Sequence, residues 1–270
     1  MKDNVPHLPP DNHTHTLLCK HAKGKPADYV RGAIHAGVSE IACTDHCPTD
    51  DGFGIGHRMA LDQFPMYCDW VAEARAASKT VRVLFGIEAD YYRGCEKFLR
   101  GFYEQHDFDI ILGSVHFLDY WCDTQFGRGF TGAPDPVQVW TDYFQLVAEM
   151  ADAKLYDVVS HFDLPKRFGN KINRETFRDL ALPALDKIAA AGMCIELNTS
   201  GVNHPHKEYY PAFDILKWSA ERGVGLVFGS DAHEPERVGD RFVAAMATAR
   251  AAGFTHFQRF EKRKRTAVAL

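Results

Sequence analysis

Histidines and carboxylates recur along this chain at the ends of short apolar segments. The first are His13 and His15, whose i, i+2 spacing on a strand puts both imidazoles on one face. Two imidazoles on one face can bind one metal ion. Similar residues follow or lie within the later apolar segments, so a metal centre is the chemistry that this pattern predicts. The candidate ligands are His13, His15, His21, His46, Glu88, His116, His161, Asp231 and His233.

The apolar segments are typical of strands that alternate with helices. Several lack polar alternation, as expected for a parallel sheet covered on both faces, and Pro and Gly stand near the expected helix ends. After a short first strand at His13, the expected strands are Glu40–Asp45, Val81–Ala89, Phe108–Phe117, Tyr156–His161, Met193–Leu197 and Val224–Gly229. The expected helices are Pro26–Ala36, Met59–Ser78, Glu96–Gln105, Pro136–Ala153, Arg174–Ala191, Ala212–Arg222 and Pro235–Ala252.

This alternation predicts right-handed βαβ units and a parallel sheet. Seven units in 270 residues favour one α/β domain, residues 1–270, folded as a closed or nearly closed barrel. The carboxyl ends of barrel strands form one face, so the scattered ligands would converge there. They are too many for one tetrahedral ion, and three ions with a bridging carboxylate would use them all.

Composition limits the partners of the chain. A net charge of −5 argues against a nucleic-acid surface built on a broad basic field. No apolar run approaches the roughly 20 residues of a membrane span, and the N-terminus lacks the apolar core of a signal peptide. We therefore expect a cytoplasmic protein with a small-molecule partner, and idle thiols for its seven cysteines, with Cys43 or Cys47 as a metal ligand the alternative. The basic run Lys262–Arg265 is interpreted as the edge of a last short strand.

The motifs around the candidate ligands resemble those of the PHP (polymerase and histidinol phosphatase) superfamily, and within it the monofunctional histidinol-phosphate phosphatases. The resemblance runs from about residue 11 to the C-terminus. It implies a distorted TIM-like (β/α)7 barrel with three divalent ions, of Zn, Mn or Fe. It assigns His13, His15, Glu88 and Asp231 to one ion, Glu88 with His116 and His161 to the second, and His21, His46 and His233 to the third. The motifs that carry it are Asp11–His15, Thr44–His46, Phe85–Glu88, Gly113–His116, Ser160–Leu164, Asn198–Gly201 and Gly229–His233.

The resemblance also implies a reaction, the hydrolysis of L-histidinol phosphate to L-histidinol and phosphate in histidine biosynthesis. Clustered divalent ions lower the pKa of a bridging water towards roughly 7 and neutralise phosphoryl oxygens. We expect direct attack on phosphorus by a metal-bridging hydroxide that the ligands hold. Asp45 is interpreted as a residue outside the metal shell that orients a ligand histidine, and a role as nucleophile or base is the alternative.

A phosphate monoester dianion also requires Arg or Lys outside the metal shell. Arg167 lies in a segment that resembles a phosphate-contact segment of the family, and Arg58 and Arg128 lie in the two long loops. One position departs from the family: Asn203 stands where a basic residue often follows the Asn-Thr-Ser-Gly motif. Either another basic residue supplies this charge or the substrate differs. The candidates for that charge are His204, His206 and Lys207.

Two other functions remain open at this stage. A PHP phosphoesterase could act on a nucleotide or sugar phosphate, and a non-catalytic metal-binding module could use the same ligands. The sequence leaves the metal open, because imidazole and carboxylate suit Zn, Fe and Mn alike, and it leaves the oligomeric state open as well.

Overall fold

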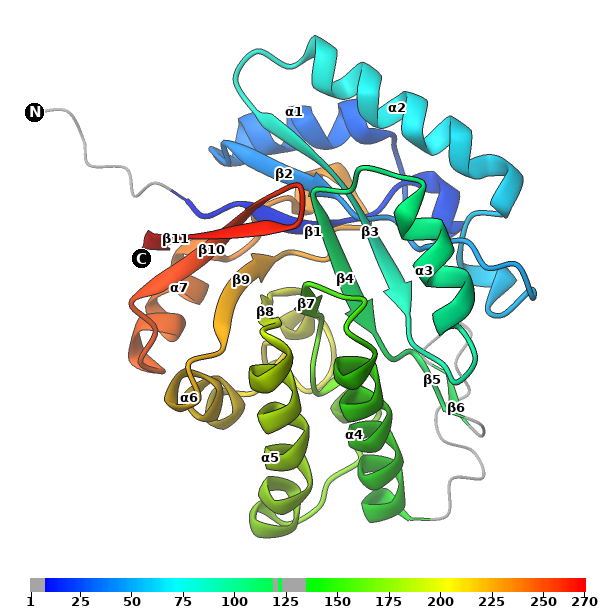
Figure 1. The fold of residues 1–270 in the computed structure, drawn as a ribbon. Coiled ribbons are helices and arrows are strands. Elements are labelled where there is room, and N and C mark those ends of the chain that lie inside the picture. Colours follow the sequence, from blue (N-terminus) through cyan, green and yellow to red (C-terminus); the bar gives the residue numbers. More distant parts are fainter. Residues whose placement is uncertain (1–7, 119–120, 123–134) are drawn as a thin grey trace, which may run out of the picture.

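Seven parallel strands form the central sheet of this protein, seen here in a computed structural model that describes residues 8–118, 121–122 and 135–270 (Figure 1). Neighbours along the sheet follow the order of the sequence, as expected for successive βαβ units. In sheet order the strands are β1 (Asp11–Thr14), β2 (Glu40–Cys43), β3 (Arg82–Asp90), β4 (Ile110–Ser114), β7 (Val158–Val159), β8 (Cys194–Asn198) and β9 (Gly225–Gly229).

The first and last strands meet and bring the sheet close to a closed barrel. The amide of His15 donates to the carbonyl of Ala232 at 2.9 Å, and the amide of Ala232 donates to the carbonyl of His13 at 3.2 Å. The expected fold class, a distorted TIM-like (β/α)7 barrel in a single domain, is confirmed. The short strands β5 (Phe117–Leu118) and β6 (Trp121–Cys122) pair with each other outside the barrel sheet.

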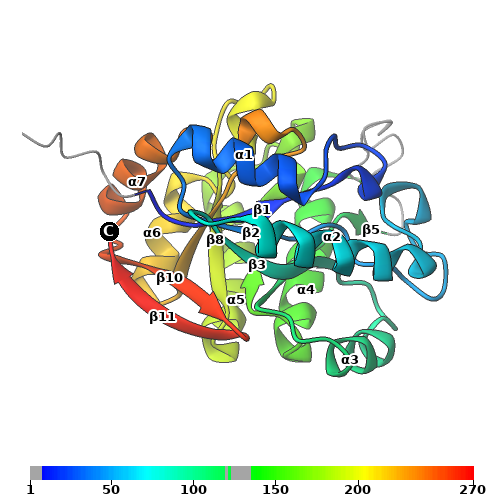
Figure 2. The ribbon, with the colours of Figure 1, turned by 90° about the horizontal axis from the view of Figure 1, so that it is seen from above.

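The helices surround the barrel (Figure 2). The larger apolar cluster of the protein fills the layer between helices and sheet, and a smaller one fills the barrel interior. The α-helices are α1 (Pro26–Ala36), α2 (Phe64–Ala77), α3 (Glu96–Glu104), α4 (Pro136–Ala153), α5 (Arg174–Ala191), α6 (Phe213–Glu221) and α7 (Phe242–Ala251). Short 3-10 helices are η1 (Leu17–Cys19), η2 (Ile55–His57), η3 (Leu61–Gln63), η4 (Leu164–Phe168), η5 (Ser200–Asn203) and η6 (Pro235–Arg237).

The expected helix Pro235–Ala252 is wrong in its first part. The structure has η6 there, then an irregular stretch, and α7 begins only at Phe242. Gly239 takes φ +67° in this stretch, a left-handed conformation that ends a helix. Its amide donates to the buried carboxylate of Asp11 at 2.8 Å, so a distant side chain takes the donor that a continuous helix would use.

The C-terminal segment is a hairpin rather than one short strand. It consists of antiparallel β10 (His256–Glu261) and β11 (Lys264–Ala269). Phe260, 3% exposed, joins the apolar cluster of the barrel interior. The turn between β10 and β11 contacts the residues just before β4 and β7. The amide of Lys262 donates to Asp109 at 3.1 Å, and Arg263 pairs with Asp157 at 3.0 Å. The hairpin therefore closes the amino end of the barrel and leaves the carboxyl end for the site.

None of the described helices is both long and apolar enough to cross a membrane.

Candidate metal centre

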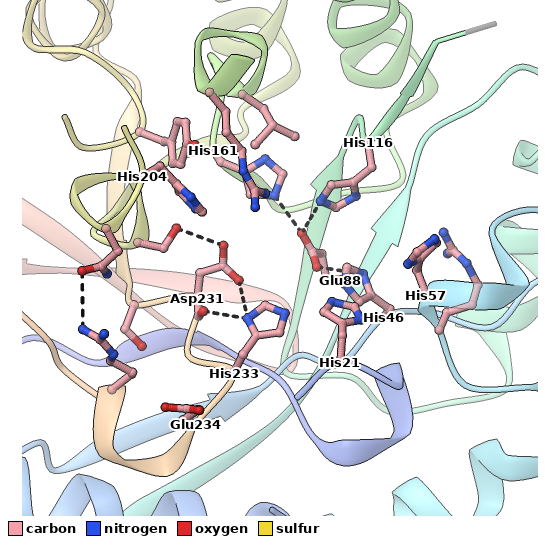
Figure 3. A pocket seen from close by; sticks show the side chains of 18 of the residues that line it. His21, His46, His57, Glu88, His116, His161, His204, Asp231, His233 and Glu234 are labelled. Carbon is pink, nitrogen blue, oxygen red and sulfur yellow. Dashed lines mark hydrogen bonds and ion pairs between the residues drawn. The ribbon is translucent and has the colours of Figure 1, made fainter. Parts of the chain in front are cut away.

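A cavity of about 370 Å³ opens where the barrel strands end (Figure 3). Seven of the nine expected ligands line it, and the other two, His13 and His15, lie fully buried beneath it. The structure thus brings together residues that span most of the sequence, as the barrel topology requires. The lining ligands are His21, His46, Glu88, His116, His161, Asp231 and His233.

Backbone conformation directs several of these side chains. His13 and His15 point to one face of β1 and its extension, whereas the hydroxyl of Thr14 between them donates to the carbonyl of Ala42 at 2.9 Å. His161 and Asp231, which follow β7 and β9, have φ of 24° and 53°. Non-glycine residues rarely adopt such angles, and they persist where the surroundings hold them, often at functional sites.

Glu88 connects two groups of histidines. Its Oε1 lies 3.0 Å from His161 Nε2 and 3.7 Å from His116 Nε2. Its Oε2 faces a different set of imidazoles, of which Figure 3 shows His46. Because each oxygen faces its own group, this carboxylate suits a bridge between two ions. From Oε2 the distances are 3.0 Å to His46 Nδ1, 3.4 Å to His13 Nε2 and 3.5 Å to His15 Nε2.

Asp231 and three outer histidines complete the cluster. Asp231 Oδ1 lies 3.1 Å from His15 Nε2 and 3.6 Å from His13 Nε2, on the side opposite its contact with the Ser200 hydroxyl. His21, His46 and His233 offer nitrogen atoms that all lie within 4.8 Å of one another. Every expected ligand therefore lies close to other members of one cluster.

The burial of unpaired atoms supports a fit to metal ions. His13 Nε2, His15 Nε2, His46 Nδ1 and Glu88 Oε2 are buried and have no hydrogen-bond partner. Leaving such atoms unpaired is costly, and a coordinated cation would satisfy all of them. Imidazole and carboxylate donors suit divalent transition metals.

Cysteines contribute little to this donor set. Cys43 and Cys47 are buried thiols whose pKa burial raises, and neither belongs to the groups of described residues with metal-binding geometry. Cys19, which the sequence analysis treated as idle, does lie in one such group, with His15 and His233.

The histidines of the cluster differ in their pKa values. Burial lowers the pKa of His13, but the charges of Glu196, Glu88 and Asp231 together outweigh it and raise that pKa well above its usual value. Burial also lowers the pKa of His15, but the nearby carboxylates of Asp231 and Asp45 outweigh it and raise that pKa to about 9. In contrast, burial lowers the pKa of His233 to about 3 and that of His46 well below its usual value. Without metal, His13 and His15 therefore hold protons that a cation would displace.

Buried carboxylates outside the cluster orient its histidines. Asp45 lies 3.7 Å from His15 Nδ1 and does not line the cavity, a position that suits the orienting role expected for it. Glu196, which the sequence analysis missed, accepts from His13 Nδ1 at 2.7 Å and from the amide of His161 at 2.9 Å. Its only sequence signal is an acidic residue inside an apolar strand.

Arg58 occupies a different environment from the one expected of a substrate contact. It lines the cavity but is 1% exposed, and its guanidinium pairs with Asp90 at 2.5 Å and donates to the carbonyl of Cys47 at 2.9 Å. Asp90 in turn lies 2.8 Å from His116 Nδ1. The charges of His116 and Arg58 outweigh burial and lower the pKa of Asp90 to about 2. Arg58 therefore acts on the site through Asp90.

The other expected substrate contacts are distributed unevenly. Arg167 and His204 line the cavity, whereas Lys207 is exposed and does not. Arg128 lies outside the described residues. Arg237, which the sequence analysis missed, also lines the cavity, and its guanidinium donates to the Asn203 side chain at 3.4 Å.

Comparison with known proteins identifies the family. The PHP domain matches residues 11–200, which include most of the cluster. The chain belongs to the PHP domain family. This PHP domain is 38% identical over 249 residues to a protein of Deinococcus radiodurans called a probable histidinol-phosphatase, an alignment that covers 90% of this chain and 93% of that one. It is 26% identical to the histidinol-phosphatase of Bacillus subtilis, over 87% of this chain and 97% of the relative.

Solved structures share the barrel. The histidinol phosphate phosphatase of Lactococcus lactis, crystallised with zinc, L-histidinol and phosphate, superposes with a TM-score of 0.82 at 20% identity and covers 96% of this chain and 98% of its own. A putative histidinol phosphatase of Listeria monocytogenes gives a TM-score of 0.74 at 23% identity, over 87% and 99% of the two chains. At these identities the likeness concerns the fold.

Proposed function

We propose that this protein is a metal-dependent phosphatase that hydrolyses L-histidinol phosphate to L-histidinol and phosphate, a step of histidine biosynthesis. The observation that carries the proposal is the group of nine ligand-type side chains around one cavity, in a chain 38% identical to a probable histidinol-phosphatase. The Lactococcus lactis enzyme of the same fold binds zinc, L-histidinol and phosphate. The free thiols of the described cysteines fit a reducing cytoplasm.

In this proposal the nine residues hold three divalent ions of Zn, Mn or Fe. Glu88 would be shared by the first two, because its Oε2 faces His13 and His15 and its Oε1 faces His116 and His161. The first ion takes His13, His15, Glu88 and Asp231, the second takes Glu88, His116 and His161, and the third takes His21, His46 and His233. The short distances within these groups support the assignment.

When bound, the ions would supply a deprotonated water at neutral pH and positive charge against the phosphoryl oxygens. The chain itself orients the donors. Glu196 accepts the Nδ1 proton of His13 and thereby directs its Nε2 at the cluster, and Asp90 does the same for His116. Arg167 and His204, on the cavity wall, are the residues we assign to substrate contact.

The test is phosphate release by the purified protein loaded with Zn²⁺, Mn²⁺ or Fe²⁺, with metal content measured on the same sample. We expect turnover of L-histidinol phosphate that is lost in His116→Ala and in Asp231→Ala. His256→Ala, on the exposed start of β10, is the matched control and should keep full activity.

Two outcomes would overturn this proposal in different ways. If L-histidinol phosphate and p-nitrophenyl phosphate both stay intact with all three metals, the protein is not a phosphatase of this kind. If a nucleotide or sugar phosphate is hydrolysed and L-histidinol phosphate is not, the metal chemistry stands and the substrate is wrong.

A further inference from the structure

Apart from histidines, four cationic side chains line the cavity within the described part of the chain: Lys23, Arg58, Arg167 and Arg237. Arg58 is buried against Asp90. Lys23 is 76% exposed and pairs with Glu234 at 2.6 Å, so its charge points to solvent and is already neutralised. Arg237 remains without an assigned role.

The guanidinium of Arg237 is held through one of its nitrogen atoms. Its Nη1 donates to Asp240 Oδ2 at 3.0 Å and to Asn203 Oδ1 at 3.4 Å. Nε and Nη2 make no hydrogen bond to any described residue. Because a guanidinium presents five donors in a planar fork, this leaves an edge available to a second, bidentate acceptor.

The backbone that carries Arg237 is fixed from two sides. Helix α1 packs directly on η6: a Cβ added at Gly32 would lie 2.0 Å from the carbonyl oxygen of Pro235. Beyond Arg237, the amide of Gly239 donates to the buried Asp11 at 2.8 Å, and Asp11 also accepts from the hydroxyl of Ser230 at 2.5 Å. The anchored backbone and the contacts of Nη1 with Asp240 and Asn203 reduce the freedom that Arg237 loses when it binds a ligand.

Arg237 also shares a cavity wall with the metal centre. Its contact Asn203 ends the short helix η5, and Ser200 at the start of that helix lies 3.2 Å from Asp231. Arg237 and the cluster ligand Asp231 therefore contact residues at the two ends of the same short helix. Both residues line the cavity that holds the candidate metal ligands.

We propose that Arg237 binds the phosphoryl group of the substrate, with Asp240 and Asn203 as positioning residues for its guanidinium. A phosphate monoester is a dianion with three terminal oxygens, and the fork of arginine matches two of them. The assignment rests on the proposed phosphatase function. It places the basic residue of this cavity wall in the segment after His233. The family often has a basic residue in the segment after Gly201 instead.

The decisive measurement is calorimetric binding of inorganic phosphate, and separately of L-histidinol, to the zinc-loaded protein. In Arg237→Gln the dissociation constant for phosphate should rise about 10- to 100-fold, the range for a lost charged hydrogen bond, and the constant for L-histidinol should stay unchanged. Arg237→Lys, which keeps the charge but not the fork, should lose less. The KM for L-histidinol phosphate should rise in parallel with the phosphate constant.

Arg174→Gln is the matched control, since Arg174 is 77% exposed and pairs with Asp214 outside the cavity. If Arg237→Gln misfolds, Asp240→Asn tests the same contact and should weaken phosphate binding to a smaller degree. The proposal is overturned if Arg237→Gln binds phosphate as tightly as the control, or if L-histidinol binding falls instead. Wild-type protein that binds phosphate but does not hydrolyse L-histidinol phosphate would refute the proposed function. The effect of Arg237→Gln on phosphate binding would still test the role of Arg237.

Discussion

Replacing Glu196 by glutamine tests whether a buried carboxylate directs the innermost histidine. Glu196 is fully buried, and its two oxygens accept from His13 Nδ1 at 2.7 Å, from the amide of His161 at 2.9 Å and from the Asn198 side chain at 3.1 Å. Glutamine has one acceptor oxygen and one NH₂ group. In either orientation, the NH₂ group of the new glutamine therefore faces a group that donates a hydrogen bond to Glu196 in the wild-type protein.

Both orientations have a defined cost. If the NH₂ group faces His161 and Asn198, buried donors lose their acceptor, which costs about 1–3 kcal/mol in the free energy of unfolding. If it faces His13, that imidazole must accept through Nδ1 and carry its proton on Nε2, the atom that lies 3.4 Å from Glu88 and is directed at the cluster. Loss of such a support lowers metal affinity or activity about 10- to 100-fold.

The assay is zinc affinity by competition with a chelator, together with kcat/KM for L-histidinol phosphate. Glu196→Gln should bind zinc about 10- to 100-fold more weakly than wild type. Glu261→Gln is the control, because Glu261 is 72% exposed on the hairpin at the other end of the barrel. Folded Glu196→Gln protein with the zinc affinity and kcat/KM of this control would refute the reasoning.

Three more perturbations follow from the structure. Phe260→Ala should lower the free energy of unfolding by about 3–5 kcal/mol, because it leaves a void in the barrel interior far from the site, and should keep the activity of the folded fraction; urea unfolding measures this. Asp90→Ala should cost about 3–5 kcal/mol, because it leaves the buried charge of Arg58 unpaired, and should reduce zinc content. Zinc binding to metal-free protein at pH 7 should release protons, since His15 has a pKa of about 9 there; calorimetry in buffers of different ionisation enthalpy counts them.

Each of these expectations has a contradicting result. An unfolding free energy of Phe260→Ala within the error of wild type would mean that the hairpin does not close the barrel core. Asp90→Ala protein with wild-type stability would mean that Arg58 finds another anion or reaches solvent. A binding heat that is independent of the buffer would mean that His15 is neutral before zinc arrives. The raised pKa of His15 also predicts a pH dependence: the number of protons released on zinc binding should fall as the pH rises through 9, because His15 is then already neutral.

Much of the site could be predicted from local sequence. Histidines and carboxylates at strand ends predict a metal centre in a parallel barrel without knowledge of any contact, because the fold itself gathers the carboxyl ends of its strands. The short motifs, such as His13-Thr14-His15, carry this information within a few residues. Alternation of apolar strands and helices likewise predicted the barrel, which the sheet order confirms.

Only the tertiary structure decided which residues support the ligands. Glu196 meets His13 from 183 positions away, and Arg237 meets Asn203 from 34 positions away. No periodicity or motif encodes such pairs, because they depend on which strand ends become neighbours in space. Asp11 shows the same effect on secondary structure: its carboxylate takes the amide of Gly239 and interrupts a segment whose composition favours a continuous helix. The local chain thus determines which donors are present, and long-range packing determines which of them bind metal, which hold others in place and which face the substrate.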